Sequence, residues 1–172
     1  MWERNWRFFG IFFIVLGIFS SAMYTTPDIL VSADNLAVKE DDNLLYSLTR
    51  KNRNFVVKTW AKQNGQNQIV NHTKFSNSNK RLKCNDYDCT YNKGNNKSVL
   101  LAHKREDILE NCNNVDLVIQ LSKFNYPACN TKIIKYSDLE AYGTHSVWLA
   151  NSGIKVSKVR SNRPWHKPKT CF

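Results

Sequence analysis

The side chains of this chain that could act as nucleophile, general base or metal ligand are scattered along it. Its four histidines stand alone, with no two of them two or four positions apart: His72, His103, His145 and His166. Metal-dependent hydrolases need histidines at fixed short spacings, as in HxH and HExxH motifs, and serine hydrolases need a marked nucleophile turn. Neither pattern is present. The sequence therefore predicts no metal site and no cofactor, and we expect a protein that is not an enzyme.

Two pairs of carboxylates lie close together in the sequence, Asp86 with Asp88 and Asp107 with Glu110. No histidine motif accompanies either pair, and the chain has no glycine-rich phosphate loop. Aspartate favours tight turns, and acidic side chains favour the first turn of a helix. We interpret the first pair as turn residues and the second pair as residues at the start of a helix.

The cysteines have a spacing that favours disulfide bonds. Cys84 and Cys89 flank a short Asn-Asp-Tyr-Asp turn, Cys112 and Cys129 bracket an apolar run, and Cys171 is left over. In an oxidising compartment this arrangement predicts two bridges, although four cysteines allow three pairings and the connectivity stays open. Reduced thiols are the alternative if the domain faces the cytoplasm. A four-cysteine zinc site is disfavoured because only one pair is close together.

Positive charge is concentrated in part of the chain. The formal net charge is +11, and residues 50–104 contain twelve Lys and Arg against only two acidic residues. Such a block can neutralise the phosphates of a nucleic acid. The candidate contacts to single-stranded DNA are Lys58, Lys62, Lys80, Arg81 and Lys83. The alternative is a solvated surface in a chain that is rich in lysine throughout.

An apolar segment near the N-terminus predicts attachment to a membrane. Phe8 to Met23 read FFGIFFIVLGIFSSAM without a charge, and Trp6 and Tyr24 flank this run. Aromatic side chains with a polar edge settle at membrane interfaces, and a spanning helix needs about 20 residues. We expect residues 1–26 to form a single transmembrane helix that anchors the chain in the lipid bilayer.

The charges around this segment predict its orientation. Arg4 and Arg7 precede the apolar run, whereas Asp28 and Asp34 follow it. Because positively charged flanks remain in the cytoplasm, we expect residues 27–160 to form a domain on the extracytoplasmic side. A cleaved signal peptide is the alternative, since the run ends in Ser-Ser-Ala, which resembles a small-residue cleavage site.

The pattern after the anchor is typical of one small, sheet-rich α+β domain. Apolar and β-branched runs between turn residues predict strands at 29–32, 36–38, 44–48, 81–84, 89–92, 98–101, 117–121, 133–134, 146–150 and 154–159. The nearly continuous apolar run at 117–121 predicts a core strand covered on both faces. Residues 66–80 are polar without periodicity and predict a mobile loop, and residues 161–172 predict a basic tail.

Two segments of this domain have helical periodicity. Residues 54–63 place Val56, Val57, Trp60 and Ala61 on one apolar face, so Trp60 is expected in the core. Residues 105–111 predict a short helix that buries Ile108, Leu109 and Cys112.

Several short motifs follow one another in a characteristic order over most of the chain. They are Pro27-Asp28-Ile29-Leu30-Val31-Ser32-Ala33-Asp34, Leu36-Ala37-Val38, Cys84-Asn85-Asp86-Tyr87-Asp88-Cys89, Cys112, Asp116-Leu117-Val118, Cys129, Tyr136-Ser137-Asp138-Leu139, Gly143-Thr144-His145-Ser146 and Arg163-Pro164-Trp165. With the preceding apolar segment, this order resembles the C-terminal end of the competence protein ComEC family, the channel proteins for DNA uptake, in its alphaproteobacterial form.

The resemblance implies a domain similar to part of a metallo-β-lactamase fold, in the inner membrane of a bacterium and facing the periplasm. It also implies a separately encoded channel half as partner, because the family's multi-helix channel is missing here. The full family domain has an HxHxDH motif and often Leu-Leu-Thr-Gly-Asp, whereas this chain reads Leu100-Leu101-Ala102-His103-Lys104. The metal-bridging aspartate is thus absent, and metal or nuclease activity is not carried over. The chain looks like a truncated or split member.

Three functions stay open at this point. The first is a non-catalytic, membrane-anchored extracytoplasmic domain, accessory to or a remnant of a competence DNA-uptake channel, with weak binding of single-stranded DNA. The second is a divergent metal-dependent hydrolase or nuclease of the β-lactamase-like type. The third is an exported protein of unrelated function that binds anionic lipid or a protein partner through its basic surface.

Overall fold

The computed structural model describes residues 6–23, 25–41, 44–49, 54–66, 68–71, 81–85, 88–94, 97–125 and 129–158. Its helices are α1 (Trp6–Ala22), α2 (Asn54–Gln63), α3 (Arg105–Asn111) and α4 (Tyr136–Tyr142), with a 3-10 turn η1 (Cys112–Asn114). The first sheet has the spatial order β11 (Gly153–Lys158), β10 (His145–Ala150), β1 (Ile29–Val31), β2 (Asn35–Asp41), β3 (Leu44–Thr49) and β4 (Gln68–Asn71). The second sheet has the order β5 (Leu82–Cys84), β6 (Cys89–Asn92), β7 (Ser98–Ala102), β8 (Leu117–Gln120) and β9 (Lys132–Ile134). The expected α+β class is confirmed.

The core between the two sheets follows from the alternation of side chains along the strands. Successive residues of a strand point to opposite faces, so every second residue can reach the facing sheet. The buried residues that meet there are Ile29, Val31, Leu36 and Val38 from the first sheet and Val99, Leu101, Leu117 and Ile119 from the second. The two sheets therefore form a sandwich.

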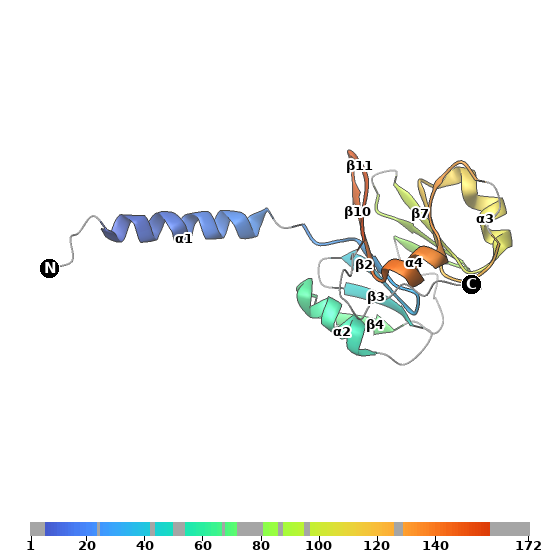
Figure 1. The fold of residues 1–172 in the computed structure, drawn as a ribbon, viewed down its shortest axis with the longest axis horizontal. Helices are drawn as coiled ribbons and strands as arrows, with labels where there is room; N and C mark the ends of the chain where they lie inside the picture. Colours follow the sequence, from blue (N-terminus) through green and yellow to red (C-terminus); the bar gives the residue numbers. More distant parts are fainter. Residues whose placement is uncertain are drawn as a thin grey trace.

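A helix covers the outer face of each sheet, and the two helices lie on opposite sides of the sandwich (Figure 1). Val57, Trp60 and Ala61 of α2 pack on the outer residues Leu30, Ala37 and Leu45 of the first sheet. Ile108 and Cys112 pack on Leu100, Ala102 and Val118 of the second sheet. Both helices connect parallel strands, α2 between β3 and β4 and α3 between β7 and β8, as a parallel connection requires. The order of layers is helix, sheet, sheet, helix.

Helix α1 presents apolar side chains that the rest of the described chain does not cover. It extends away from the sandwich (Figure 1), and Phe9, Phe13 and Phe19 are 65–67% exposed. The helix has 17 residues, and at about 1.5 Å per residue it is about 26 Å long against a hydrocarbon core of roughly 30 Å. Within the described ranges no helix is both long and apolar enough to cross a membrane, so the expected transmembrane helix is not supported.

Most predicted elements are present with small shifts of their bounds. The helix at 54–63, the helix at 105–111 and the terminal hairpin are confirmed, and the run at 117–121 is β8, buried on both faces as expected. Trp60 is buried in the α2 interface, as predicted. The expected tail at 161–172 lies outside the described residues.

Three details of the predicted elements were wrong. Gln68–Asn71, placed in the mobile loop 66–80, form β4, because Ile69 pairs beside Leu45 and packs against the α2 cluster; residues 72–80 lie outside the described residues. Helix α4 was missed, because its seven residues bury only Leu139 and give no periodic signal. Leu109 is 59% exposed, since the short α3 turns only one side to the sheet.

Candidate functional site

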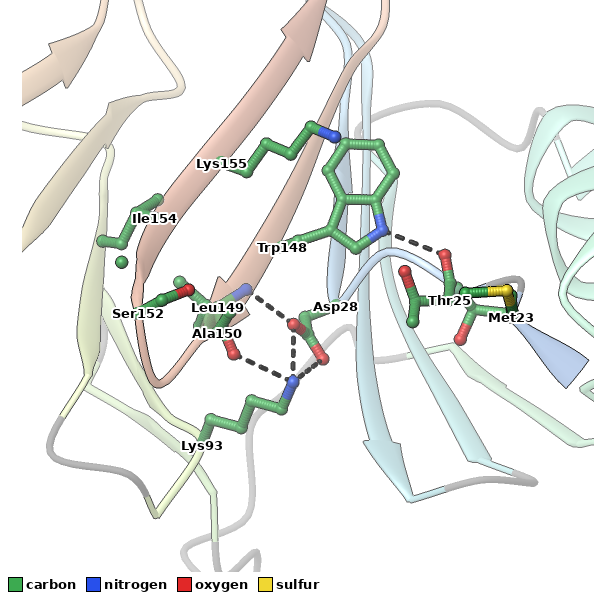
Figure 2. A pocket seen from close by; sticks show the side chains of 12 residues that line it. Met23, Thr25, Asp28, Lys93, Trp148, Leu149, Ala150, Ser152, Ile154 and Lys155 are labelled. Atoms are coloured by element: carbon green, nitrogen blue, oxygen red, sulfur yellow. Dashed lines mark hydrogen bonds and ion pairs between the residues drawn. The ribbon is translucent and has the colours of Figure 1, made fainter.

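A cleft of about 640 Å³ opens where the β10–β11 hairpin, the chain before β1 and the turn after β6 meet (Figure 2). It is lined by Met23, Thr25, Thr26, Asp28, Lys93, Trp148, Leu149, Ala150, Ser152, Gly153, Ile154 and Lys155. These residues combine apolar surface with a few polar groups, which is the usual composition of a binding site.

The floor of the cleft is an ion pair between the nearly buried Asp28 carboxylate and the partly exposed Lys93 ammonium. Lys93 Nζ lies 2.8 Å from both carboxylate oxygens of Asp28 and donates to the Leu149 carbonyl oxygen at 3.0 Å. The Leu149 N–H donates to Asp28 Oδ2 at 2.7 Å. Lys93 directly follows β6 of the second sheet, whereas Asp28 directly precedes β1 and Leu149 lies in β10 of the first sheet. The pair therefore joins the two sheets, and its hydrogen bonds compensate for the desolvation of the charges.

One wall of the cleft is an aromatic and a basic side chain on neighbouring strands. Trp148 and Lys155 are register partners in the β10–β11 hairpin, and Lys155 Nζ lies 5.8 Å from the centre of the indole ring. Trp148 Nε1 donates to the Thr25 carbonyl oxygen at 3.1 Å, which fixes the ring beside the segment that leads to α1 (Figure 2). The wall thus offers a preorganised ring and an exposed ammonium group.

A second polar group ties the same two sheets together near β2. The Tyr91 hydroxyl donates to the Lys39 carbonyl oxygen at 2.7 Å, and burial together with the nearby Asp28 carboxylate raises the pKa of Tyr91. The Arg81 N–H donates to Glu40 Oε1 at 3.0 Å, and the Arg81 guanidinium donates to the Glu40 carbonyl oxygen. Arg81 therefore connects the start of β5 to β2.

The predicted nucleic-acid contacts do not form one surface. Lys58 and Lys62 are exposed on α2, over the outer face of the first sheet. Lys83 is exposed on β5 and pairs with Thr90, whose next neighbour Leu100 packs under α3. The Lys83 side chain therefore projects from the outer face of the second sheet, on the side of the sandwich opposite to α2. Arg81 is engaged with Glu40, and Lys80 lies outside the described residues.

Both predicted cysteine pairs are at disulfide distance. Cys84 and Cys89 are direct register partners of β5 and β6, with Cα atoms 4.0 Å apart. Cys112 and Cys129 have Cα atoms 6.2 Å apart and connect η1 to the segment before β9. Thr131 supports the second bridge by donating its hydroxyl to the Cys112 carbonyl oxygen at 2.7 Å. Cys171 lies outside the described residues.

Among the described residues, His103, His145, Asp88, Asp107 and Glu110 are not part of the cleft lining. His145 is fully buried with Nδ1 2.9 Å from the Gly143 carbonyl oxygen, and burial lowers the pKa of its imidazole. Asp107 accepts the Lys104 N–H at 2.9 Å, which is the helix-start role expected for it. Burial, and next the Asp107 charge, raise the pKa of Asp88. In the part of the chain that the structure describes, no three His, Cys, Asp or Glu side chains are grouped to hold a metal ion.

Sequence reasoning missed the residues that build the cleft, namely Asp28, Lys93, Trp148 and Lys155. The sequence contains one signal for the cleft wall. Trp148 and Lys155 lie at paired positions of the predicted terminal hairpin, and such a tryptophan–lysine pair is recognisable as a surface feature. The Asp28–Lys93 pair joins residues 65 positions apart and has no local signature.

Comparison with known proteins adds no relative, since no protein-family model, curated protein or solved structure matches this chain. The fold and the site define a helix-flanked β-sandwich with a cleft at the foot of an apolar helix.

Proposed function

We propose that this chain is a non-catalytic, extracytoplasmic accessory domain, or a remnant, of a competence DNA-uptake channel of the ComEC type. The observation that carries the location is the presence of two cysteine pairs at disulfide distance, Cys84 with Cys89 and Cys112 with Cys129. Disulfides persist in oxidising compartments such as the bacterial periplasm and are rare in the cytosol. The order of motifs supports the family, with a domain similar to part of a metallo-β-lactamase fold and a separately encoded channel half as partner.

The non-catalytic assignment is supported by how the polar groups of the cleft are used. The Asp28 carboxylate already accepts hydrogen bonds from Lys93 and from the Leu149 N–H. A general base must be able to reach a proton of the substrate, and a nucleophile needs an adjacent base. The cleft therefore offers surfaces for binding, whereas the Asp28 carboxylate and the Lys93 ammonium hold the sheets together.

Weak contact with single-stranded DNA would use the outer face of α2. Lys58 and Lys62 are exposed and four residues apart, so both ammonium groups lie on the same face of the helix. Among the described candidate contacts, these two can act together, whereas Lys83 lies on the opposite side of the sandwich. The affinity would come from counterion release and fall steeply with salt.

Titration of the full chain with a labelled oligonucleotide at low and moderate salt tests this contact. We expect binding at low salt, and the variant Lys58→Glu/Lys62→Glu should lose most of it. If each lysine neutralises one phosphate, the slope of log affinity against log salt should fall by about 1.4. The matched control is Lys123→Glu/Lys132→Glu, which makes the same charge change at exposed lysines of the second sheet's side. Equal losses in both variants, or no binding by the wild type, would contradict the proposal.

The location has a separate test. We propose that the apolar surface of α1 directs the domain across the membrane, because Arg4 and Arg7 precede it and acidic residues follow it. Alkaline phosphatase fused behind Phe172 should be active, since this enzyme needs export to fold. Sequencing the N-terminus of the exported product then shows whether α1 is retained or removed after Ala22. An inactive fusion, with an active cytoplasmic reporter in its place, would overturn the extracytoplasmic location.

A further inference from the structure

We propose that the cleft at the foot of α1 binds the phosphodiester headgroup of an anionic phospholipid. The inference goes beyond the DNA-uptake role, and it rests on the membrane-side location proposed above. Three observations carry it: the continuity of the cleft with an exposed apolar helix, the single cation of its lining that has no ion pair within the described chain, and the aromatic ring beside that cation.

The first observation is that the cleft begins where α1 ends. Met23, which directly follows α1 and is 83% exposed, is itself a lining residue. Between Phe9 and Phe19 the side chains of α1 are apolar on all sides and exposed, with Phe12 at 59% and Ile18 at 65%. A helix that is apolar all round is stable only inside a protein core or in lipid, and no described element covers this one. Lipid against α1 places its headgroups at Met23, and therefore at the mouth of the cleft.

The second observation concerns charge. Lys93 is neutralised by Asp28 at 2.8 Å, so this pair contributes no net charge to the lining. Lys155 is exposed, and among the described residues it contacts the Trp148 ring and forms no ion pair. The cleft therefore carries one net positive charge. This charge is on Lys155, in the wall that Lys155 forms with Trp148. One cation is complementary to the single negative charge of a phosphodiester.

The third observation is the pairing of Trp148 with Lys155. An indole ring and a long lysine stem are both suited to the membrane interface, where apolar atoms meet lipid and polar ends meet water. The hydrogen bond from Trp148 Nε1 to the Thr25 carbonyl oxygen holds the ring beside the segment that leads into α1. Stacking of a nucleobase is less favoured, because the Lys155 ammonium already lies over the ring face. Lipid is thus the better occupant than nucleic acid.

The experiment uses the full chain, labelled with ¹⁵N, in micelles of a neutral detergent. The indole N–H signal of Trp148, identified by its loss in Trp148→Phe, reports on the cleft, and that of the buried Trp60 reports that the domain stays folded. Dihexanoyl phosphatidylglycerol should move the Trp148 signal to saturation, and dihexanoyl phosphatidylcholine, with the same chains but no net charge, should bind at least several-fold more weakly. Lys155→Gln should weaken the phosphatidylglycerol effect about fivefold. The matched control Lys158→Gln, on the same strand with its ammonium over Tyr142, should stay within about twofold of the wild type.

Several outcomes would overturn the assignment. They are an unchanged Trp148 signal, equal binding of the two lipids, and equal losses in the Lys155 and Lys158 variants. Inorganic phosphate binding as tightly as phosphatidylglycerol would leave a bare anion subsite, and a tighter effect of an oligonucleotide would assign the cleft to nucleic acid. Because this titration requires neither export nor binding to α2, its failure can be distinguished from failure of the proposed function.

Discussion

Replacing Lys93 by methionine removes the cation that faces the nearly buried Asp28 carboxylate. Breaking a fully buried ion pair from one side costs about 3–5 kcal/mol, because the remaining charge is left in a poorly solvated place. Here the Lys93 side chain is 31% exposed, whereas the Asp28 side chain is 8% exposed. The Leu149 N–H also still donates to the carboxylate when Lys93 is replaced. We therefore expect Lys93→Met to lower the free energy of unfolding by about 2–3 kcal/mol.

The assay is urea-induced unfolding of the full chain in neutral-detergent micelles, followed by circular dichroism. Asp28→Asn removes the negative charge but keeps an oxygen for the Leu149 N–H, so the double variant Lys93→Met/Asp28→Asn should lose at least about 1 kcal/mol less than the sum of the single losses. Lys97→Met is the matched control, because the Lys97–Asp116 pair has a similar distance of 3.0 Å but both side chains are about 30% exposed. Its loss should stay below about 1 kcal/mol.

Two results would contradict this stabilising role of the Lys93–Asp28 pair. If Lys93→Met and Lys97→Met lowered the free energy of unfolding equally, burial of the carboxylate would not determine how much the ion pair stabilises the fold. If the losses of the two single variants at Lys93 and Asp28 simply added, the two charges would not interact, and the floor of the cleft would not be a connection between the sheets.

The remaining predictions concern the second disulfide, a buried histidine and the exposed side of α3. Replacing Cys112 and Cys129 by serine should lower the free energy of unfolding by about 3 kcal/mol on the chain-entropy model, and non-reducing peptide mapping should recover this pair linked in the wild type. Because burial lowers the pKa of His145, the unfolded chain binds the proton more readily, and unfolding measured against pH should show stability lost as the pH falls below about 6.5; His145→Gln should flatten that dependence. Ile108→Ala should cost about 2–5 kcal/mol in the same unfolding assay, whereas Leu109→Ala should cost less than about 0.5 kcal/mol, and equal losses would contradict the packing of α3.

Local patterns were sufficient for the elements whose signals are local. The helix at 54–63 has an apolar face formed by Val56, Val57, Trp60 and Ala61, and the terminal hairpin has a turn-forming Asn-Ser-Gly between two alternating strands. The Cys84–Cys89 pairing follows from a short turn that brings two strand ends face to face. In each case the residues that specify the structure lie within about a dozen positions of one another, so local patterns predict the element, although the pairing of the cysteines stays open from sequence.

The arrangement of these elements could not be predicted, because it depends on contacts between distant parts of the chain. Lys58 and Lys83 belong to one basic block in the sequence, but their side chains project from opposite faces of the sandwich. Only the strand order reveals this. The Asp28–Lys93 pair forms when the start of β1 meets the turn after β6, and neither residue has a partner nearby in sequence. The candidate cleft could not be predicted either, because its lining residues come from distant parts of the chain.

The position of β1 in the first sheet determines how the domain would carry a mechanical load. The chain leaves α1 and enters β1, which is buried along its length and hydrogen-bonded on both edges, to β10 and to β2. A pull on the N-terminal end of β1 therefore acts on two antiparallel ladders at once, with the Trp148 to Thr25 bond as a first resistance. A pull on β11, which is paired on one edge to β10 and ends the first sheet, would instead peel a single ladder one bond at a time. The domain is thus connected to α1 through the strand of this sheet that is harder to extract, so force transmitted through α1 would meet its stronger end.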